Sequence, residues 1–145
     1  MSITAKVYGL AQQSLANKEI DFDTDTIMVM LCTSTYTPNQ DTHRYKSDIT
    51  NEVTGTGYTA TGQALTSKTV TYDAPSNTLT LSTANPSWAA STITARYAVF
   101  YDASPATDAT RPLILYWDFG ADVSSSSGTF TLTINASGLL TLATA

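Results

Sequence analysis

An unbroken apolar run from Ile27 to Cys32 predicts a buried β-strand, because it is too short for an independent helix and polar turn residues bound it on both sides. Successive side chains of a strand point to opposite faces. Both faces are therefore apolar: one carries Ile27, Val29 and Leu31, and the other carries Met28, Met30 and Cys32. We expect both to be covered, one by an opposite sheet and the other by an N-terminal helix, a loop or a neighbouring subunit.

Apolar residues near the start of the chain recur at helical spacing and predict one helix over residues 4–17. Thr4 is a suitable N-cap for it. So short a helix is not stable alone, and it needs a groove on the sheet or on another subunit. The candidate contact residues are the apolar ones on its stripe, Val7, Leu10 and Leu15, with Ala11 between them.

Alternating polar and apolar positions from residue 64 onward predict a series of β-strands. The first two form a hairpin around a turn at 73–77. Its apolar side chains are expected to point inward and its threonines outward, the inward set being Val70, Tyr72, Leu79 and Leu81.

Further strands are expected at 93–101, 113–119, 129–134 and 139–142, and the serine-rich segment 124–128 is expected to be flexible. Unbroken alternation in the first of these strands places on one face Ile93, Ala95, Tyr97, Val99 and Tyr101. The chain as a whole, residues 1–145, is therefore predicted to be a single mainly β domain. The expected architecture is an antiparallel β-sandwich, jelly-roll or Ig-like, of about seven to eight strands with one N-terminal helix.

A polar connection over residues 34–63 is unusually long for a compact domain, which favours a functional role or a short element within it. Its three tyrosines, Tyr36, Tyr45 and Tyr58, are amphipathic side chains of the kind that pack at interfaces. They either contact a partner or pin the loop to its own sheet. Trp88, just before the 93–101 strand, is a fourth aromatic candidate for an interface.

Composition narrows the classes of function. Charged residues make up 13% of the chain, well below the about 25% of an average domain, and the formal net charge is −5. Nucleic-acid-binding proteins concentrate Lys and Arg, so no nucleic-acid partner is expected. The single cysteine allows no internal disulfide and is expected to be a small buried side chain. No segment has the length of a membrane span or the form of a signal peptide, so synthesis in a reducing cytoplasm is expected.

No pattern of catalytic or metal-binding residues stands out. One cysteine and one histidine, His43, do not make a zinc site, and no nucleophile elbow is present. The acidic segment from Asp21 to Asp25 has Thr26 and Cys32 where a calcium loop needs glycine and glutamate, so an Asx-type turn is favoured over a cation site. We expect no enzyme activity and no cofactor. The carboxylates that could form a glycosidase pair are Asp48, Glu52, Asp118 and Asp122, and nothing singles out two of them.

The two tryptophans permit a third class, a carbohydrate-binding module for adsorption to a host, in which aromatic rings stack on sugars. Alternation places Trp117 with the core residues of its strand, whereas the position of Trp88 is less determined.

Four segments, which together span most of the chain, form a recognisable pattern. They are IDFDTDTI at 20–27 continuing into LCTSTYTPN at 31–39, DITNEVTGTGY at 48–58, ARYAVFY at 95–101 and LILYWDFG at 113–120. In this order they resemble a family of small virion structural proteins of tailed bacteriophages, which are placed on the capsid or on the tail.

The resemblance implies a structural role in the virion and no catalytic residues. Within that role we expect a capsid decoration, or cement, protein on the capsid surface, made in the cytoplasm of the bacterial host. The major capsid protein is the expected partner, and a homo-oligomer, a dimer or trimer, is the default assembly. A tail or neck component is the alternative within the same class.

Overall fold

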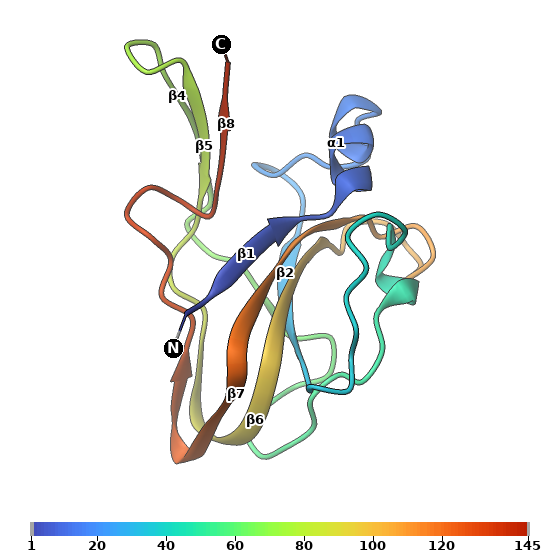
Figure 1. Cartoon of the computed structure of the whole chain (residues 1–145), viewed down its shortest axis with the longest axis vertical. Helices are drawn as coiled ribbons and strands as arrows, with labels where there is room; N and C mark the ends of the chain where they lie inside the picture. The colour runs from blue at the N-terminus through green and yellow to red at the C-terminus, as the bar shows by residue number, and fades with distance from the viewer. Residues whose placement is uncertain (1, 145) are drawn as a thin grey trace.

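The computed structural model describes residues 2–144 and is mainly β, with two antiparallel sheets and one α-helix near the N-terminus (Figure 1). This confirms the predicted fold class. The larger sheet has the order β1 (Thr4–Val7), β7 (Leu113–Thr131), β6 (Ser87–Asp102), β2 (Ile27–Cys32) and β3 (Gln63–Ala64). The smaller sheet has the order β4 (Thr69–Asp73), β5 (Thr78–Ser82) and β8 (Leu140–Ala143). The helices are α1 (Gly9–Ala16) and a short 3₁₀ turn, Lys46–Asp48.

The two faces of β2 lie in two separate hydrophobic clusters, as the sequence predicted. Ile27, Val29 and Leu31 belong to the larger cluster, which also holds Phe100 from the adjacent β6 and Trp117 from β7 beyond it. The opposite face contributes to a second cluster, made of Met30, Cys32, Tyr8, Ala11, Tyr36, Val99, Tyr101, Leu113 and Tyr116. Residues from α1 and from the long connection therefore cover this second face.

The N-terminal segment differs from the prediction, because residues 4–7 form a strand and not the first turn of a helix. This strand, β1, pairs antiparallel with β7, with Ala5 opposite Trp117, and α1 begins only at Gly9. Without β1, the backbone N–H and C=O groups on this edge of β7 would lack hydrogen-bond partners. Pairing with β7 therefore outweighs the weak helical periodicity of residues 4–7. Thr4 is therefore not an N-cap, and Val7 packs between the two clusters at the end of β1.

A break in the strand register explains why the predicted face of β6 is wrong. Ile93 and Ala95 lie in the larger cluster, whereas Val99 and Tyr101 lie in the smaller one. The pairing with β7 shifts between Ala95 and Tyr97. The partner changes from Val123 for Ala95 to Asp118 for Tyr97, so two positions of β6 span five of β7. An odd shift in register moves the later side chains to the opposite face.

The serine-rich segment 124–128 lies inside β7 and is not a flexible linker. The hydroxyls of Ser91 and Ser125 are 2.7 Å apart, and those of Thr94 and Ser124 are also 2.7 Å apart. These cross-strand contacts, together with the backbone ladder to β6, order a sequence whose composition alone favours disorder.

Gly62 allows the chain to turn tightly against β2, and we predict that Gly62→Ala is strongly destabilising. Gly62 has φ of +85°, and a Cβ there would clash with the carbonyl oxygen of Val29. The left-handed backbone and the clash with main chain together should cost about 3 kcal/mol of unfolding free energy. Denaturant unfolding measures this, with Gly128→Ala as the control because its Cβ would meet only Ser126 O, at 3.7 Å. Equal midpoints for the two variants would contradict the assignment.

Candidate functional site

The smaller sheet has one wholly apolar face and one polar face. Its register places Val70, Leu81 and Leu140 in one row across the three strands, and Tyr72, Leu79 and Leu142 in the next. The intervening positions carry the polar face, made chiefly of Thr69, Thr71, Thr78, Thr80, Ser82 and Thr141. In a sheet with this pattern the apolar face is the one that packs against something else.

This apolar face is largely open to solvent, which contradicts the prediction that the hairpin points it into the core. Val70 is 42% exposed, Tyr72 57% and Leu142 40%, and within residues 2–144 only Ile3 is a further large hydrophobic side chain exposed to this degree. At the base of the sheet, Leu81 is buried in the larger cluster and Leu140 packs against it, half-buried. Figure 1 shows the reason: β4, β5 and β8 project away from the larger sheet.

A groove runs between this apolar face and the segment that links α1 to β2. Its wall on the sheet side is formed by Val70, Leu79, Leu81 and Leu142, and its opposite wall by Leu15, Ile20 and Phe22. Its volume is about 680 Å³, within the range of ligand and peptide clefts. The charged side chains on its rim are Lys18, Asp21 and Asp23. The groove is therefore an apolar trough with a charged rim, a form suited to an apolar segment of another molecule.

Local hydrogen bonds hold the far wall of the groove in place. Asp21 Oδ1 accepts from the backbone N–H of Thr24 at 3.2 Å, and Asp25 Oδ2 accepts from the N–H of Asp21 at 2.9 Å. The first of these contacts lowers the pKa of Asp21. These are the contacts of an Asx-type turn, as favoured from the sequence. Lys68, which precedes β4, donates to the carbonyl of Asp25 and so ties the smaller sheet to this turn.

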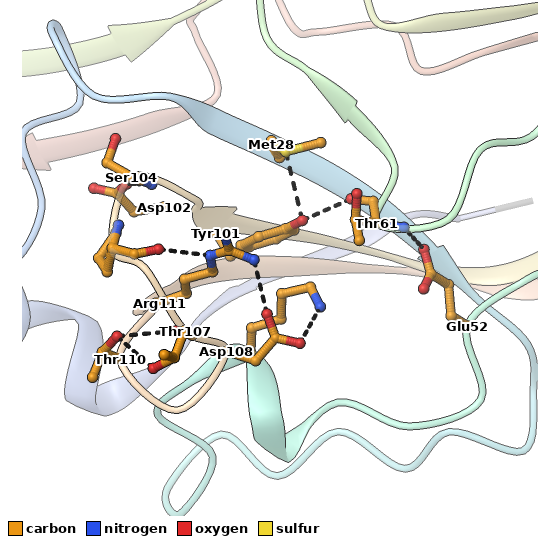
Figure 2. Close-up of polar contacts among 12 residues, drawn as sticks. Met28, Glu52, Thr61, Tyr101, Asp102, Ser104, Thr107, Asp108, Thr110 and Arg111 are labelled. Atoms are coloured by element: carbon orange, nitrogen blue, oxygen red, sulfur yellow. Dashed lines mark hydrogen bonds and ion pairs between the residues drawn. The ribbon is translucent and has the colours of Figure 1, made fainter.

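A buried carboxyl lies beside that turn, at the end of β6 (Figure 2). Asp102 is fully buried, and its Oδ1 accepts from the N–H of Ser104 at 2.8 Å. Its Oδ2 meets no donor in the described chain. Burial, and next the neighbouring Asp25 carboxyl, raise the pKa of Asp102 to about 7. The raised pKa favours the protonated form of Asp102, which avoids an unpaired negative charge in the buried site.

An ionic network in the same region joins two loops (Figure 2). Asp108 accepts from Arg111 at 2.8 Å and from Lys46 at 2.7 Å. Nearby, the hydroxyl of Tyr101 donates to the carbonyl of Thr61 at 2.7 Å. These contacts fasten the 103–112 loop and the long connection to the larger sheet.

The aromatic candidates from the sequence lie mostly inside the molecule. Tyr36 is 1% exposed, and its hydroxyl contacts Tyr8 at 2.9 Å and His43 Nδ1 at 3.0 Å. Tyr58 donates to Glu52 at 2.7 Å and stacks on Trp88, which is itself buried. Of the two alternatives for the loop tyrosines, the structure thus favours pinning the loop to its own sheet, and Trp88 is not available to a partner.

The remaining interface candidates are half-buried. Tyr45 packs beneath the guanidinium of Arg44, at 5.0 Å from its ring centroid. Leu10 and Leu15 lie on α1, where Leu15 forms part of the groove wall. The structure therefore places one predicted contact residue, Leu15, at the groove. Sequence reasoning placed Val70 and Tyr72 in the core and did not identify them, or Leu142, as surface residues, because alternation shows only that a strand has an apolar side.

Three of the four carboxylates considered for catalysis, Asp48, Glu52 and Asp118, already have bonding partners in the chain. Asp48 Oδ2 accepts from the N–H groups of Arg44 and Tyr45, and Asp118 pairs with Arg96 at 2.6 Å. Within residues 2–144 no cluster of three or more metal-ligating side chains occurs, and no helix has the length and apolarity needed to cross a membrane. Comparison of the chain with protein-family models, curated proteins and solved structures finds no match.

We predict that Asp102→Asn makes the protein more stable above pH 7 and flattens its pH dependence. The pKa of Asp102 is higher in the folded chain, about 7, than in the unfolded chain, about 3.9. Its contribution is therefore fully present below pH 4 and is lost as the pH rises through 7. Asparagine keeps the acceptor for Ser104 and offers a permanent donor toward Asp25.

The expected gain at pH 8 is about 2 kcal/mol in unfolding free energy, with little difference from the parent chain at pH 4. Chemical denaturation between pH 4 and pH 9 measures it. A variant that loses the same stability as the parent over this range would show that Asp102 is ionised throughout.

Proposed function

We propose that this chain is a bacteriophage virion structural protein, and specifically a capsid decoration protein that docks on the outer shell through the groove beside the smaller sheet. The observation that carries the proposal is the open apolar face of Val70, Tyr72 and Leu142. Monomeric soluble proteins rarely leave a contiguous apolar surface exposed unless it binds a partner. The sequence resemblance to tailed-phage virion proteins supplies the class of partner.

The docking mechanism follows from the two walls of the groove. An apolar loop or arm of the major capsid protein would contact the sheet on one side and Leu15, Ile20 and Phe22 on the other. Burying both sides of the inserted segment gains more apolar area than a flat patch does. Because this binding favours the intact shell over the ruptured one, it stabilises the shell by mass action.

The burial of both tryptophans argues against the carbohydrate-binding alternative. Trp88 is 5% exposed and Trp117 7%, so neither ring offers a platform on which a sugar can stack. The number of copies per virion distinguishes a capsid decoration protein from a tail component. A decoration protein occupies many lattice sites, whereas a tail or neck component is present in few copies. Localisation in a cryo-EM map of the particle distinguishes them directly.

We predict that Leu142→Lys abolishes docking without unfolding the protein. Leu142 lines the groove but is largely exposed, so the substitution removes apolar contact area and places a charge in the interface at little cost to the fold. The dissociation constant for purified, expanded phage heads should rise about tenfold or more. Co-sedimentation with heads that lack the protein measures it, together with the temperature at which the heads rupture.

Thr141→Lys is the matched control, because it adds the same charge to the same strand on the opposite, polar face. It should bind as the parent chain does. If the parent chain shows no saturable binding to heads, or if both lysine variants bind equally well, docking through the groove is wrong.

A further inference from the structure

β4 is an edge strand in which every residue is exposed. It pairs with β5 on one side only, and within residues 2–144 no hydrogen bond reaches the backbone of its other side. It contains no proline, and its own sequence is Thr-Val-Thr-Tyr-Asp, rich in residues that favour strands. Such an unprotected edge is a template for pairing with another strand.

The hydrogen-bond pattern identifies which groups of β4 face outward. The N–H of Thr144 donates to the carbonyl of Asn77, on the same register as the pairing of β5 with β8. Along an antiparallel strand, the backbone N–H and C=O groups of successive residues point alternately to the two neighbouring strands. The odd-numbered residues of β5 therefore form hydrogen bonds with β8, and the even-numbered ones with β4. The partners on β4 of those even-numbered residues are Thr69, Thr71 and Asp73. The N–H and C=O groups of Val70 and Tyr72 therefore point to the open side.

We propose that β4 pairs with β4 of a second copy of this chain, antiparallel across a two-fold axis at Thr71. In this register Val70 of one copy is opposite Tyr72 of the other, and both present their free backbone groups to each other. The two Thr71 residues form the intervening pair, which is not hydrogen-bonded. The same sequence thus supplies all donors and acceptors that the symmetric ladder needs.

The side chains of this register are mutually favourable. The register pairs Val70 with Tyr72 twice and Thr71 with Thr71 once at the centre. Pairs of a β-branched with an aromatic residue, and of two threonines, stabilise neighbouring strands. Thr69 is opposite Asp73, so no like charges face one another. The apolar faces of the two small sheets become one continuous six-stranded surface. In Figure 1, β8 lies on the side of the smaller sheet nearer α1 and β4 on the far side.

Pairing through one five-residue strand buries much less surface area than stable dimers do, which is about 1,200 Å² or more. The pairing is therefore weak in dilute solution and increases with local concentration, as on a particle surface. The net charge of −5 per chain opposes it at low salt, so association should strengthen as ionic strength rises.

Cysteine trapping tests the register directly. At the two-fold axis the Cα atoms of Thr71 and its counterpart should be about 4.5 Å apart, within the range of a disulfide. Two copies of Thr69 would be about 14 Å apart along the strand, far beyond it. The native Cys32 is fully buried, so it does not compete. Under mild oxidation, Thr71→Cys should give a covalent dimer in high yield, whereas Thr69→Cys and Thr141→Cys should stay at least tenfold lower.

A charge variant provides an independent readout without a cross-link. Thr71→Lys places two lysines opposite each other and should abolish the concentration-dependent dimer seen by analytical ultracentrifugation, whereas Thr141→Lys on the opposite edge of the sheet should not. Circular dichroism confirms that each variant is folded. Equal cross-linking at positions 69, 71 and 141 would overturn the proposal, and so would preferential cross-linking at 141.

The outcome is separable from that of the proposed function. If the chain binds phage heads but its Thr71→Cys variant forms no covalent dimer, only the pairing is overturned. If that variant forms the dimer but the chain does not bind heads, only the docking role is overturned.

Discussion

The need to bury both faces of one sheet organises this protein. β2 is apolar on both sides, and β6 and β7 continue each side across the sheet, so neither face can meet water. One face is covered by α1 and by the long connection that carries Tyr36. The other is covered by Leu81 of the smaller sheet and by side chains from the segments that lead into and out of that sheet, including Leu65 and Leu139. The connections are long because they serve as the second and third layers of the core.

The chain satisfies most of its polar groups within itself while doing so. Tyrosine hydroxyls at positions 8, 36, 58 and 101 each have a hydrogen-bonding partner in the chain. Burial raises the pKa of all four, so the phenols stay neutral at any physiological pH. The loops are thereby held by neutral contacts that salt does not screen. Most of the aromatic rings pack inside the molecule, and the exposed one, Tyr72, lies on the apolar face of the smaller sheet.

The periodicity of apolar residues predicted most of the strands, but it could not identify the elements that pack against them. The two faces of β2 were evident from six consecutive residues, because burial on both sides leaves an uninterrupted apolar run. The register shift after Ala95 lies opposite the residues of β7 between Asp118 and Val123. Gly120, with φ of +78°, was a signal there that sequence reasoning did not use, so the later half of β6 was placed on the wrong face. The start of the chain was misjudged because pairing with β7 is a tertiary demand. The groove was missed because alternation in Val70 and Tyr72 shows that a strand is amphipathic without showing whether its apolar side meets a core.

The reactivity of the Cys32 thiol reports local opening of the structure. The thiol is fully buried at the end of β2, and burial raises its pKa to about 12, so it reacts with neither oxidants nor alkylating reagents while the larger sheet is closed. The smaller sheet contains no cysteine and shares only its base with the core. Opening of that sheet is therefore silent to thiol chemistry, whereas exposure of the second cluster, by movement of α1, of the long connection or of β2 itself, is registered. Two levels of local stability, one for each sheet, can thus be told apart in a single chain.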